Sequence, residues 1–297
     1  MESWGLHQVH EQETVYWQNS YMRIWVRRSD AAWRVAFSPH EYEDEVEVAR
    51  SGRLGGLLGK AIGFVLPPDP AHEESTSEEL AWQDFIPEVE GDSIGIFPVL
   101  PENSVVVRTE VPITLGAGCS LSLYAAIPLW LSVRVVNSRE GAGRVKGGYM
   151  NMGAALLSVP VFTLSQTWFG GPMTGRLCYR SDKTLSYSPN IPIDPLAYAL
   201  CPIKVRNSSR AAIKIGSIAV PTEQMKLFRT VGSEHDVVFW TNPVSAVYTA
   251  AEELHLGVID KHPKIGETLE PWMPPRISPT DHLFKRGMIF LRDITNS

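Results

Sequence analysis

The chain has few cysteines, no long apolar run and no basic leader, and each absence excludes a class of protein. Its three cysteines, Cys119, Cys178 and Cys201, are odd in number and widely spaced. A disulfide framework uses paired cysteines, so we expect reduced thiols in a cytoplasmic protein. No stretch approaches the roughly 18 apolar residues of a membrane-spanning helix, and the first residues lack the pattern of a signal peptide. We therefore expect a cytoplasmic protein without a membrane span.

Positive charge is also scarce. The 297 residues include 27 Lys and Arg against 33 Asp and Glu, which gives a formal net charge of −6. The densest basic cluster is the pair Arg27 and Arg28. Proteins that bind nucleic acids concentrate positive charge against the phosphate backbone. The composition therefore predicts no nucleic-acid partner, while its 44% hydrophobic residues predict a folded globular protein.

Long segments with the 3.6-residue period of a helix are missing, whereas short segments that alternate with a period of two are common. In residues 15–37 two such segments, at 21–27 and 33–37, flank a polar turn, which is typical of a β-hairpin. The clearest alternation lies at 129–135 and predicts a half-buried strand. Gly216 and Ser217 shift the phase of a later strand, as a β-bulge does. Turn residues recur about every 8–12 positions, so the sequence predicts an all-β, antiparallel β-sandwich with little helix.

The low-complexity region at 41–79 divides this pattern. It contains an acidic run, several glycines and a proline cluster, and it predicts extended loops. We therefore expect an N-terminal hairpin unit with its loops at 1–90 and a sandwich region at 91–297. Residues 128–138 and 202–208 share a Pro, an alternating strand and an Asn-Ser turn. Two similar sandwich halves with a division near 185–198, or one large sandwich, both remain open.

Sequence signals for catalysis are weak. The glycine-rich stretch 52–61 has Leu54 where a phosphate-binding loop needs glycine and Ala61 where it needs a hydroxyl. Cys178 lies between Arg176 and Arg180, which could lower the pKa of its thiol, but a buried structural cysteine is the simpler interpretation. No nucleophile elbow or zinc-protease motif is present. We therefore lean toward a protein that is not an enzyme and uses no cofactor.

The alternative hypothesis, an enzyme with a metal site, rests on three histidines. His235, His255 and His262 could converge if their strands are neighbours, and zinc is commonly held by three or four such ligands. This pattern would fit a metal-dependent hydrolase. Exposed histidines on strand faces are the competing interpretation.

The most distinctive stretch is an aromatic corner near the middle of the chain. Trp168 and Phe169 lead directly into Gly170-Gly171-Pro172 and then Met173. An exposed corner would offer Trp168, Phe169 and Met173 to a ligand or partner, whereas a buried one would close the end of the core. The leading hypothesis is binding to another protein, or self-association, through this corner or a sheet edge. A carbohydrate-binding module is a further alternative, because exposed aromatic side chains on sandwiches often bind sugars.

Several of these segments resemble a known family. Residues 164–170 (Leu-Ser-Gln-Thr-Trp-Phe-Gly), 175–179 (Gly-Arg-Leu-Cys-Tyr), 199–208 and 127–130 are similar to a prokaryotic domain-of-unknown-function family, family 432 (DUF432). The resemblance covers roughly residues 90–263. It implies a cytosolic prokaryotic domain, and it carries no activity, substrate or catalytic residue to any position.

Overall fold

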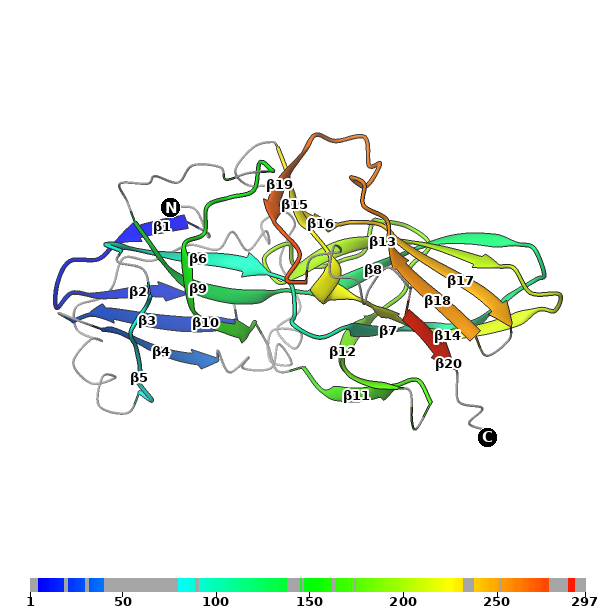
Figure 1. Ribbon diagram of the computed structural model, residues 1–297, viewed down its shortest axis with the longest axis horizontal. Coiled ribbons are helices and arrows are strands. Elements are labelled where there is room, and N and C mark those ends of the chain that lie inside the picture. Colours follow the sequence, from blue (N-terminus) through cyan, green and yellow to red (C-terminus); the bar gives the residue numbers. More distant parts are fainter. Residues whose placement is uncertain are drawn as a thin grey trace, which may run out of the picture. The chain divides into compact units, whose positions relative to one another are not determined.

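The computed structural model confirms the all-β class. It describes residues 5–18, 21–29, 32–39, 80–88, 91–137, 145, 147–161, 164–171, 173, 175–231, 238–250, 253–277 and 288–291. This part of the chain forms twenty strands and one short 3-10 helix, η3 (Thr222–Gln224) (Figure 1). Among these residues, no helix is long and apolar enough to cross a membrane. The acidic run and the glycine-rich stretch lie outside the described residues.

The chain forms two compact units, and each is built from separate pieces of sequence. The first comprises Met1–Phe97, Leu131–Ala142 and Met152–Phe162. The second comprises Pro98–Trp130, Gly143–Asn151 and Thr163–Ser297. The boundary at residue 90 and the division near 185–198 stay predictions.

Two four-stranded sheets make up the first unit. One has the order β1 (Gly5–Gln8), β6 (Ser93–Val99), β9 (Trp130–Val136), β10 (Ala154–Pro160). The other has the order β2 (Thr14–Gln18), β3 (Met22–Arg28), β4 (Trp33–Pro39), β5 (Gln83–Phe85). The hairpin predicted in residues 15–37 is formed by β3 and β4, which pair antiparallel, and its first residues belong to a further strand, β2, which pairs with β3. Its apolar residues Met22, Ile24 and Val26 are buried, as the alternation indicates.

The prediction that residues 129–135 form a half-buried strand is wrong about the burial of β9. Trp130 and Ser132 are buried as well as Leu131, Val133 and Val135. The strand is interior to its sheet, between β6 and β10, and both of its faces are covered. The hydroxyl of Ser158 donates to the Ser132 hydroxyl at 3.1 Å, which lets a polar residue occupy the second buried face. The side chains of β9 do alternate between two faces, but the face that carries Ser132 is buried and does not contact solvent.

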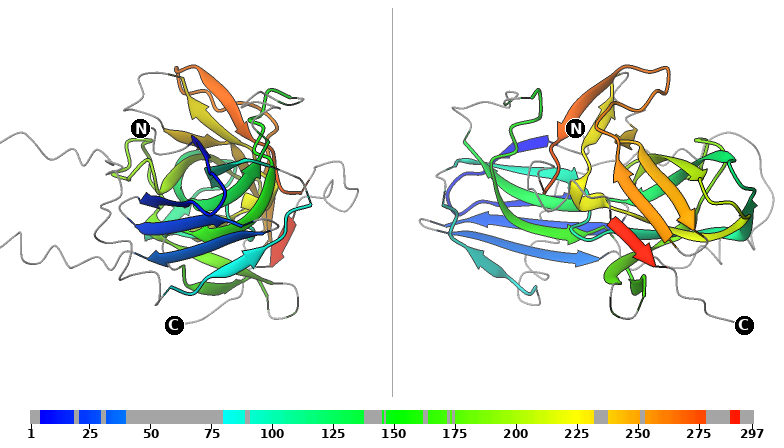
Figure 2. Two further views of the ribbon diagram at one scale, coloured as in Figure 1. Left: turned by 90° about the vertical axis from the view of Figure 1, so that its left-hand side faces the viewer. Right: turned by 45° about the vertical axis from the view of Figure 1, so that its right-hand side comes forward.

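The second unit contains a four-stranded sheet and an eight-stranded sheet (Figures 1 and 2). The smaller has the order β11 (Gln166–Phe169), β12 (Arg176–Thr184), β7 (Val105–Leu115), β14 (Ile213–Val220). The larger has the order β19 (Leu269–Met273), β15 (Leu227–Thr230), β16 (Phe239–Thr241), β13 (Tyr198–Asn207), β17 (Val244–Ala250), β18 (Glu253–Val258), β20 (Met288–Leu291). Its eighth strand, β8 (Ser120–Pro128), lies off this path and pairs with β13.

Local patterns in this unit are largely confirmed. The pairing of β14 with β7 shifts register between Ile215 and Ser217, which is the predicted bulge. Strand β19 lies in a proline-rich segment, residues 261–279, whose composition predicts coil and gives no strand signal. Pro271 is tolerated there because β19 is an edge strand, where a residue without an N–H can face away from the ladder.

Candidate functional site

The aromatic corner is the tip of a hairpin formed by β11 and β12. Trp168 is directly opposite Leu177 in the antiparallel pairing, and Phe169 is opposite Arg176. The backbone N–H of Gly175 donates to the carbonyl of Gly171 at 2.7 Å and closes the turn. These pairs place Trp168 and Leu177 side by side on one face of the hairpin.

The position of the Trp168 ring is fixed by two contacts. Its indole Nε1–H donates to the same Gly171 carbonyl at 3.2 Å. A Cβ atom on Gly175 would lie 2.3 Å from that Nε1 and 2.7 Å from the Gly171 oxygen. Such approaches are closer than real Cβ atoms allow, so the turn requires glycine at 175. The indole is therefore preorganised rather than loosely attached.

Apolar surface is concentrated on this hairpin. Trp168 is 53% exposed, Met173 94% and Leu177 47%, whereas Phe169 is half-buried. Trp168, Met173 and Leu177 are three of the eight large hydrophobic side chains that are exposed among the described residues. The interpretation of the corner as a core plug therefore does not hold for Trp168. We define Trp168, Met173 and Leu177 as the hairpin tip.

The hairpin also ends its sheet. Strand β11 pairs with β12 alone among the described strands, and the sheet order places it at the edge. An edge strand presents backbone N–H and C=O groups that can accept another strand. The exposed apolar side chains thus adjoin a potential pairing edge.

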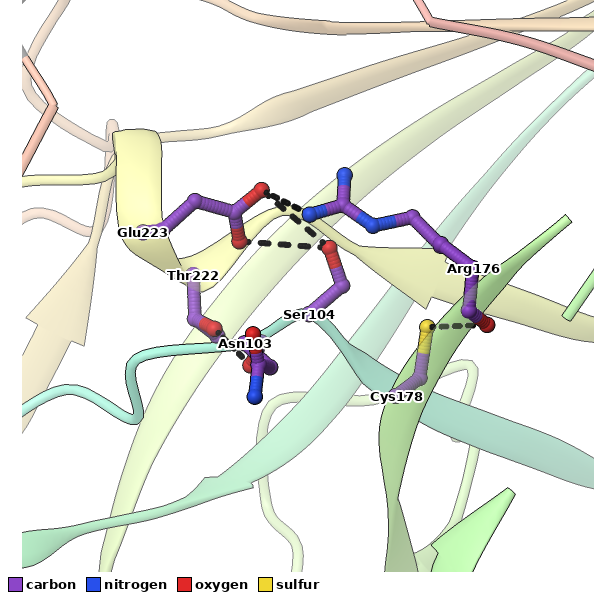
Figure 3. Close-up of polar contacts among 6 residues, drawn as sticks. All are labelled: Asn103, Ser104, Arg176, Cys178, Thr222 and Glu223. Carbon is purple, nitrogen blue, oxygen red and sulfur yellow. Dashed lines mark hydrogen bonds and ion pairs between the residues drawn. The ribbon is translucent and has the colours of Figure 1, made fainter. Parts of the chain in front are cut away.

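A buried polar cluster anchors the same hairpin at Arg176, the first residue of β12, which lies beside the turn and opposite Phe169 (Figure 3). The guanidinium Nη2 of Arg176 is 2.9 Å from Oε1 of Glu223. The hydroxyl of Ser104 donates toward both carboxylate oxygens, at 3.4 and 3.2 Å. The side chain of Glu223 is 3% exposed and that of Arg176 is 30% exposed. We call Arg176, Glu223 and Ser104 the hairpin root.

Local structure explains how Glu223 reaches this position. It lies in η3, the single helical turn between β14 and β15, and the hydroxyl of Thr222 holds this turn by donating to the carbonyl of Asn103 at 2.7 Å. A buried carboxylate is tolerated when a cation and hydrogen-bond donors surround it. The cluster therefore ties two strand connections, β6–β7 and β14–β15, to the start of β12.

The thiol hypothesis for Cys178 finds no support in its surroundings. Its side chain is buried, and its Sγ lies 3.6 Å from the carbonyl of Arg176. Burial raises the pKa of the Cys178 thiol to about 11, and the nearby Arg176 charge offsets this only in part. The thiol is therefore protonated at neutral pH and is a poor nucleophile.

The predicted histidine cluster is only partly described. His235 lies outside the described residues. His255 is in β18, opposite Val247, and His262 is exposed with its ring 4.7 Å from that of Phe228. In the part of the chain that the structure covers, no three His, Cys, Asp or Glu side chains are grouped to hold a metal ion. The histidine site stays a prediction.

Sequence reasoning missed the hairpin root. Ser104 and Glu223 are 119 residues apart, and neither belongs to a recognisable motif. The only local signal is a glutamate in an otherwise weakly polar segment, Val-Pro-Thr-Glu-Gln-Met at 220–225. The cluster was therefore visible only once β7, β12 and η3 were brought together.

The fold and the corner define an all-β protein with packed sheets, an exposed aromatic hairpin tip and a buried ionic root. A scan against family models matches residues 3–291 to the family described as "Protein of unknown function (DUF432)". The chain belongs to this family, and the match extends well beyond residues 90–263, to which the resemblance had been assigned. Searches of curated proteins and of solved structures gave no match.

Proposed function

We propose that this chain is a non-enzymatic binding protein of the cytoplasm that docks another protein on the hairpin tip. The observation that carries the proposal is the joint exposure of Trp168, Met173 and Leu177 on one preorganised hairpin. Single exposed apolar side chains are common, but several gathered on one surface often mark an interaction site, and Trp is among the residues most enriched at the energetic centres of interfaces.

The expected partner is an extended apolar segment of another protein. Strand β11 is short, with four residues, and its outer edge can pair with an added strand while the tip receives an apolar side chain. A stable symmetric dimer buries on the order of 1,600 Å², which four edge residues and three side chains do not supply. A single peptide-like segment fits this surface better than a second copy.

Preorganisation favours binding at this surface. The bond from Trp168 Nε1 to Gly171 and the close approach of Gly175 hold the indole in place before any partner arrives. Ordering a free side chain at an interface costs about 0.5–1.5 kcal/mol. Because Trp168 is already ordered, binding at the tip does not incur this cost for its largest side chain.

The cytoplasmic part of the proposal is supported by the cysteines. Cys178 and Cys201 are buried and unpaired, and Cys119 is exposed and unpaired. An exposed free thiol is favoured in a reducing compartment. The net charge of −6 supports a protein partner over a nucleic acid.

A site-specific photocrosslinker tests the proposal directly. p-Benzoylphenylalanine would replace Met173 in the tip, and in a matched control it would replace Val111, an exposed apolar residue of β7. We expect one discrete adduct from position 173, none from position 111, and loss of the adduct on adding Trp168→Ala. The captured protein, once purified, should bind the wild-type chain and lose at least about tenfold in affinity with Trp168→Ala.

Two results would overturn the proposal. One is equal labelling from both positions, or labelling that survives Trp168→Ala. The other is a Trp168-dependent affinity for an oligosaccharide without any protein adduct, which would favour the carbohydrate-binding alternative.

A further inference from the structure

A second surface, in the first unit, combines aromatic rings with arginines. Strands β2 and β3 pair so that Tyr16 lies opposite Trp25, and Arg23 and Arg27 flank Trp25 at alternate positions of β3. All four side chains therefore project from the face of the sheet opposite to the buried Ile24 and Val26. We call Tyr16, Arg23, Trp25 and Arg27 the arginine–aromatic face; its blue strands are seen in Figure 2, left.

The aromatic rings of this face are in contact and only partly buried. The ring centroids of Tyr16 and Trp25 are 5.5 Å apart with an interplanar angle of 47°. Both residues keep part of their surface open to solvent. A pair of half-exposed rings offers a flat ligand an apolar platform with π-faces.

The two arginines differ in how they are held. The Nε–H of Arg27 donates to the Thr14 hydroxyl at 2.8 Å, and its guanidinium lies 5.4 Å from the ring of Trp82. Among the described residues, the buried Nε of Arg23 has no hydrogen-bond acceptor, and none of their ion pairs includes Arg23. Its charge acts on Tyr16, where it opposes the upward shift of the phenol pKa that burial causes.

The neighbouring Arg34, in contrast, has a carboxylate partner on the same sheet. It lies opposite Arg27 on β4, and its Nε is 2.6 Å from Asp84 Oδ1. A partly buried guanidinium is costly where its hydration is reduced and no counter-ion replaces it, and the described residues supply none to Arg23. Arg23 is thus the position on this face where an anion would be most stabilised.

We propose that the arginine–aromatic face binds a small planar anion, a flat ring that carries a phosphate or carboxylate group. The ring would stack on Trp25 and Tyr16 while the oxyanion pairs with the guanidinium of Arg23. Arginine presents a planar fork of N–H donors that matches the oxygens of both anionic groups. The charge and the aromatic surface are adjacent, so one small molecule can use both.

A long polyanion is the less suitable occupant. The chain carries a net charge of −6, which repels an extended nucleic acid, whereas a small ligand senses mainly the local field of Arg23 and Arg27. The proposal is independent of the hairpin tip and goes beyond the binding of a protein partner.

Calorimetric titration of the full chain tests this site with defined probes. Adenosine 5′-monophosphate and 1-naphthoate each join a ring to an anion, and adenosine, naphthalene-1-methanol and inorganic phosphate each lack one of the two parts. We expect at least one ring–anion probe to bind at least about tenfold more tightly than its incomplete counterparts. Arg23→Gln should weaken that probe by about tenfold or more, because a charge-assisted hydrogen bond is lost.

The control and the rescue separate a binding role from a structural one. Arg34→Gln removes a nearby arginine that already has a carboxylate partner, and it should leave the affinity of the probe unchanged. Arg23→Lys keeps the charge without the fork and should restore part of the affinity, and it also serves as the test if Arg23→Gln fails to fold.

Three results would overturn the inference. They are no binding of either ring–anion probe at millimolar concentration, equal losses from Arg23→Gln and Arg34→Gln, or tighter binding of a single-stranded oligonucleotide that does not depend on Arg23.

Discussion

Arg176 of the root and Leu177 of the tip are adjacent in the β11–β12 hairpin, but the two regions have opposite character. The tip is apolar and exposed, with Met173 at 94% exposure. The root is charged and buried, with the Glu223 side chain at 3%. Folding normally places these groups the other way round. The difference supports the proposal that the root holds the hairpin and that the tip binds a partner.

The two regions also differ in how their chemistry is satisfied. At the root, every oxygen of the Glu223 carboxylate has a donor, from Arg176 or Ser104. At the tip, the one polar side-chain atom of Trp168 is bonded to Gly171, but 53% of the residue's surface is exposed. The polar groups of the root are therefore satisfied within the chain, whereas the tip keeps exposed apolar surface for the proposed partner. The predictions below test this contrast from the largest expected effect to the smallest.

Arg176→Ala should have the largest effect on stability. It leaves the Glu223 carboxylate buried without its cation, and breaking a buried pair in this way costs about 3–5 kcal/mol. Urea unfolding monitored by circular dichroism measures the loss. Arg180→Ala is the matched control, because Arg180 is an exposed arginine of the same strand and its loss should change stability by no more than about 0.5 kcal/mol.

A double variant then tests whether the root acts as a pair. Arg176→Met combined with Glu223→Leu removes both charges and keeps apolar volume, so most of the stability lost in Arg176→Ala should return. A double variant as unstable as the single one would contradict the interpretation of the root as an ion-pair anchor.

Gly175→Ala should have an intermediate effect, concentrated at the turn. The new Cβ would meet the Trp168 ring and the Gly171 carbonyl, and relieving such overpacking costs about 1–3 kcal/mol. Faster amide hydrogen exchange at 166–169 and 176–178, with the other sheet unchanged, is the expected signature. Gly257→Ala is a suitable control, because a Cβ at that position of β18 meets nothing within 4 Å.

Trp168→Ala should hardly change stability, by about 1 kcal/mol or less, because half of the side chain is already in water. The same substitution should abolish the adduct expected from position 173. A large loss of stability would mean that Trp168 is a structural residue, and the contrast between tip and root would fail.

The cysteines provide the smallest and most local test. In the native chain only Cys119 should react rapidly with a thiol reagent, and Cys178 and Cys201 should react after unfolding. Burial raises the pKa of Cys178 from 9.0 to about 11. A raised pKa in the folded state means that its contribution to stability is complete below pH 9 and is lost as the pH rises toward 11. Comparing wild type with Cys178→Ala at pH 7 and pH 10.5 isolates this contribution.

Local features of the fold could be predicted from the sequence, because they depend on neighbouring residues. The alternation of Met22, Ile24 and Val26 predicted β3, and the phase shift at Gly216 predicted the bulge that the pairing of β14 with β7 confirms. The family was likewise recognised from short segments, and its match covers residues 3–291.

Features that depend on distant contacts could not be predicted. Whether Ser132 faces water depends on what covers β9, and whether Trp168 is exposed depends on what packs over the hairpin. Ser104 and Glu223 meet across 119 residues, and no local pattern records that contact. The sequence therefore singled out the corner at Trp168, which the structure shows to be exposed, but not the ion-pair cluster of the hairpin root.

The most direct test of the central claim is the photocrosslinking comparison of positions 173 and 111 in cells, with and without Trp168→Ala. A single protein adduct from position 173 that requires Trp168 is the predicted result. Labelling that is absent from position 173, or that persists without Trp168, would contradict the assignment of the hairpin tip as a protein-binding surface.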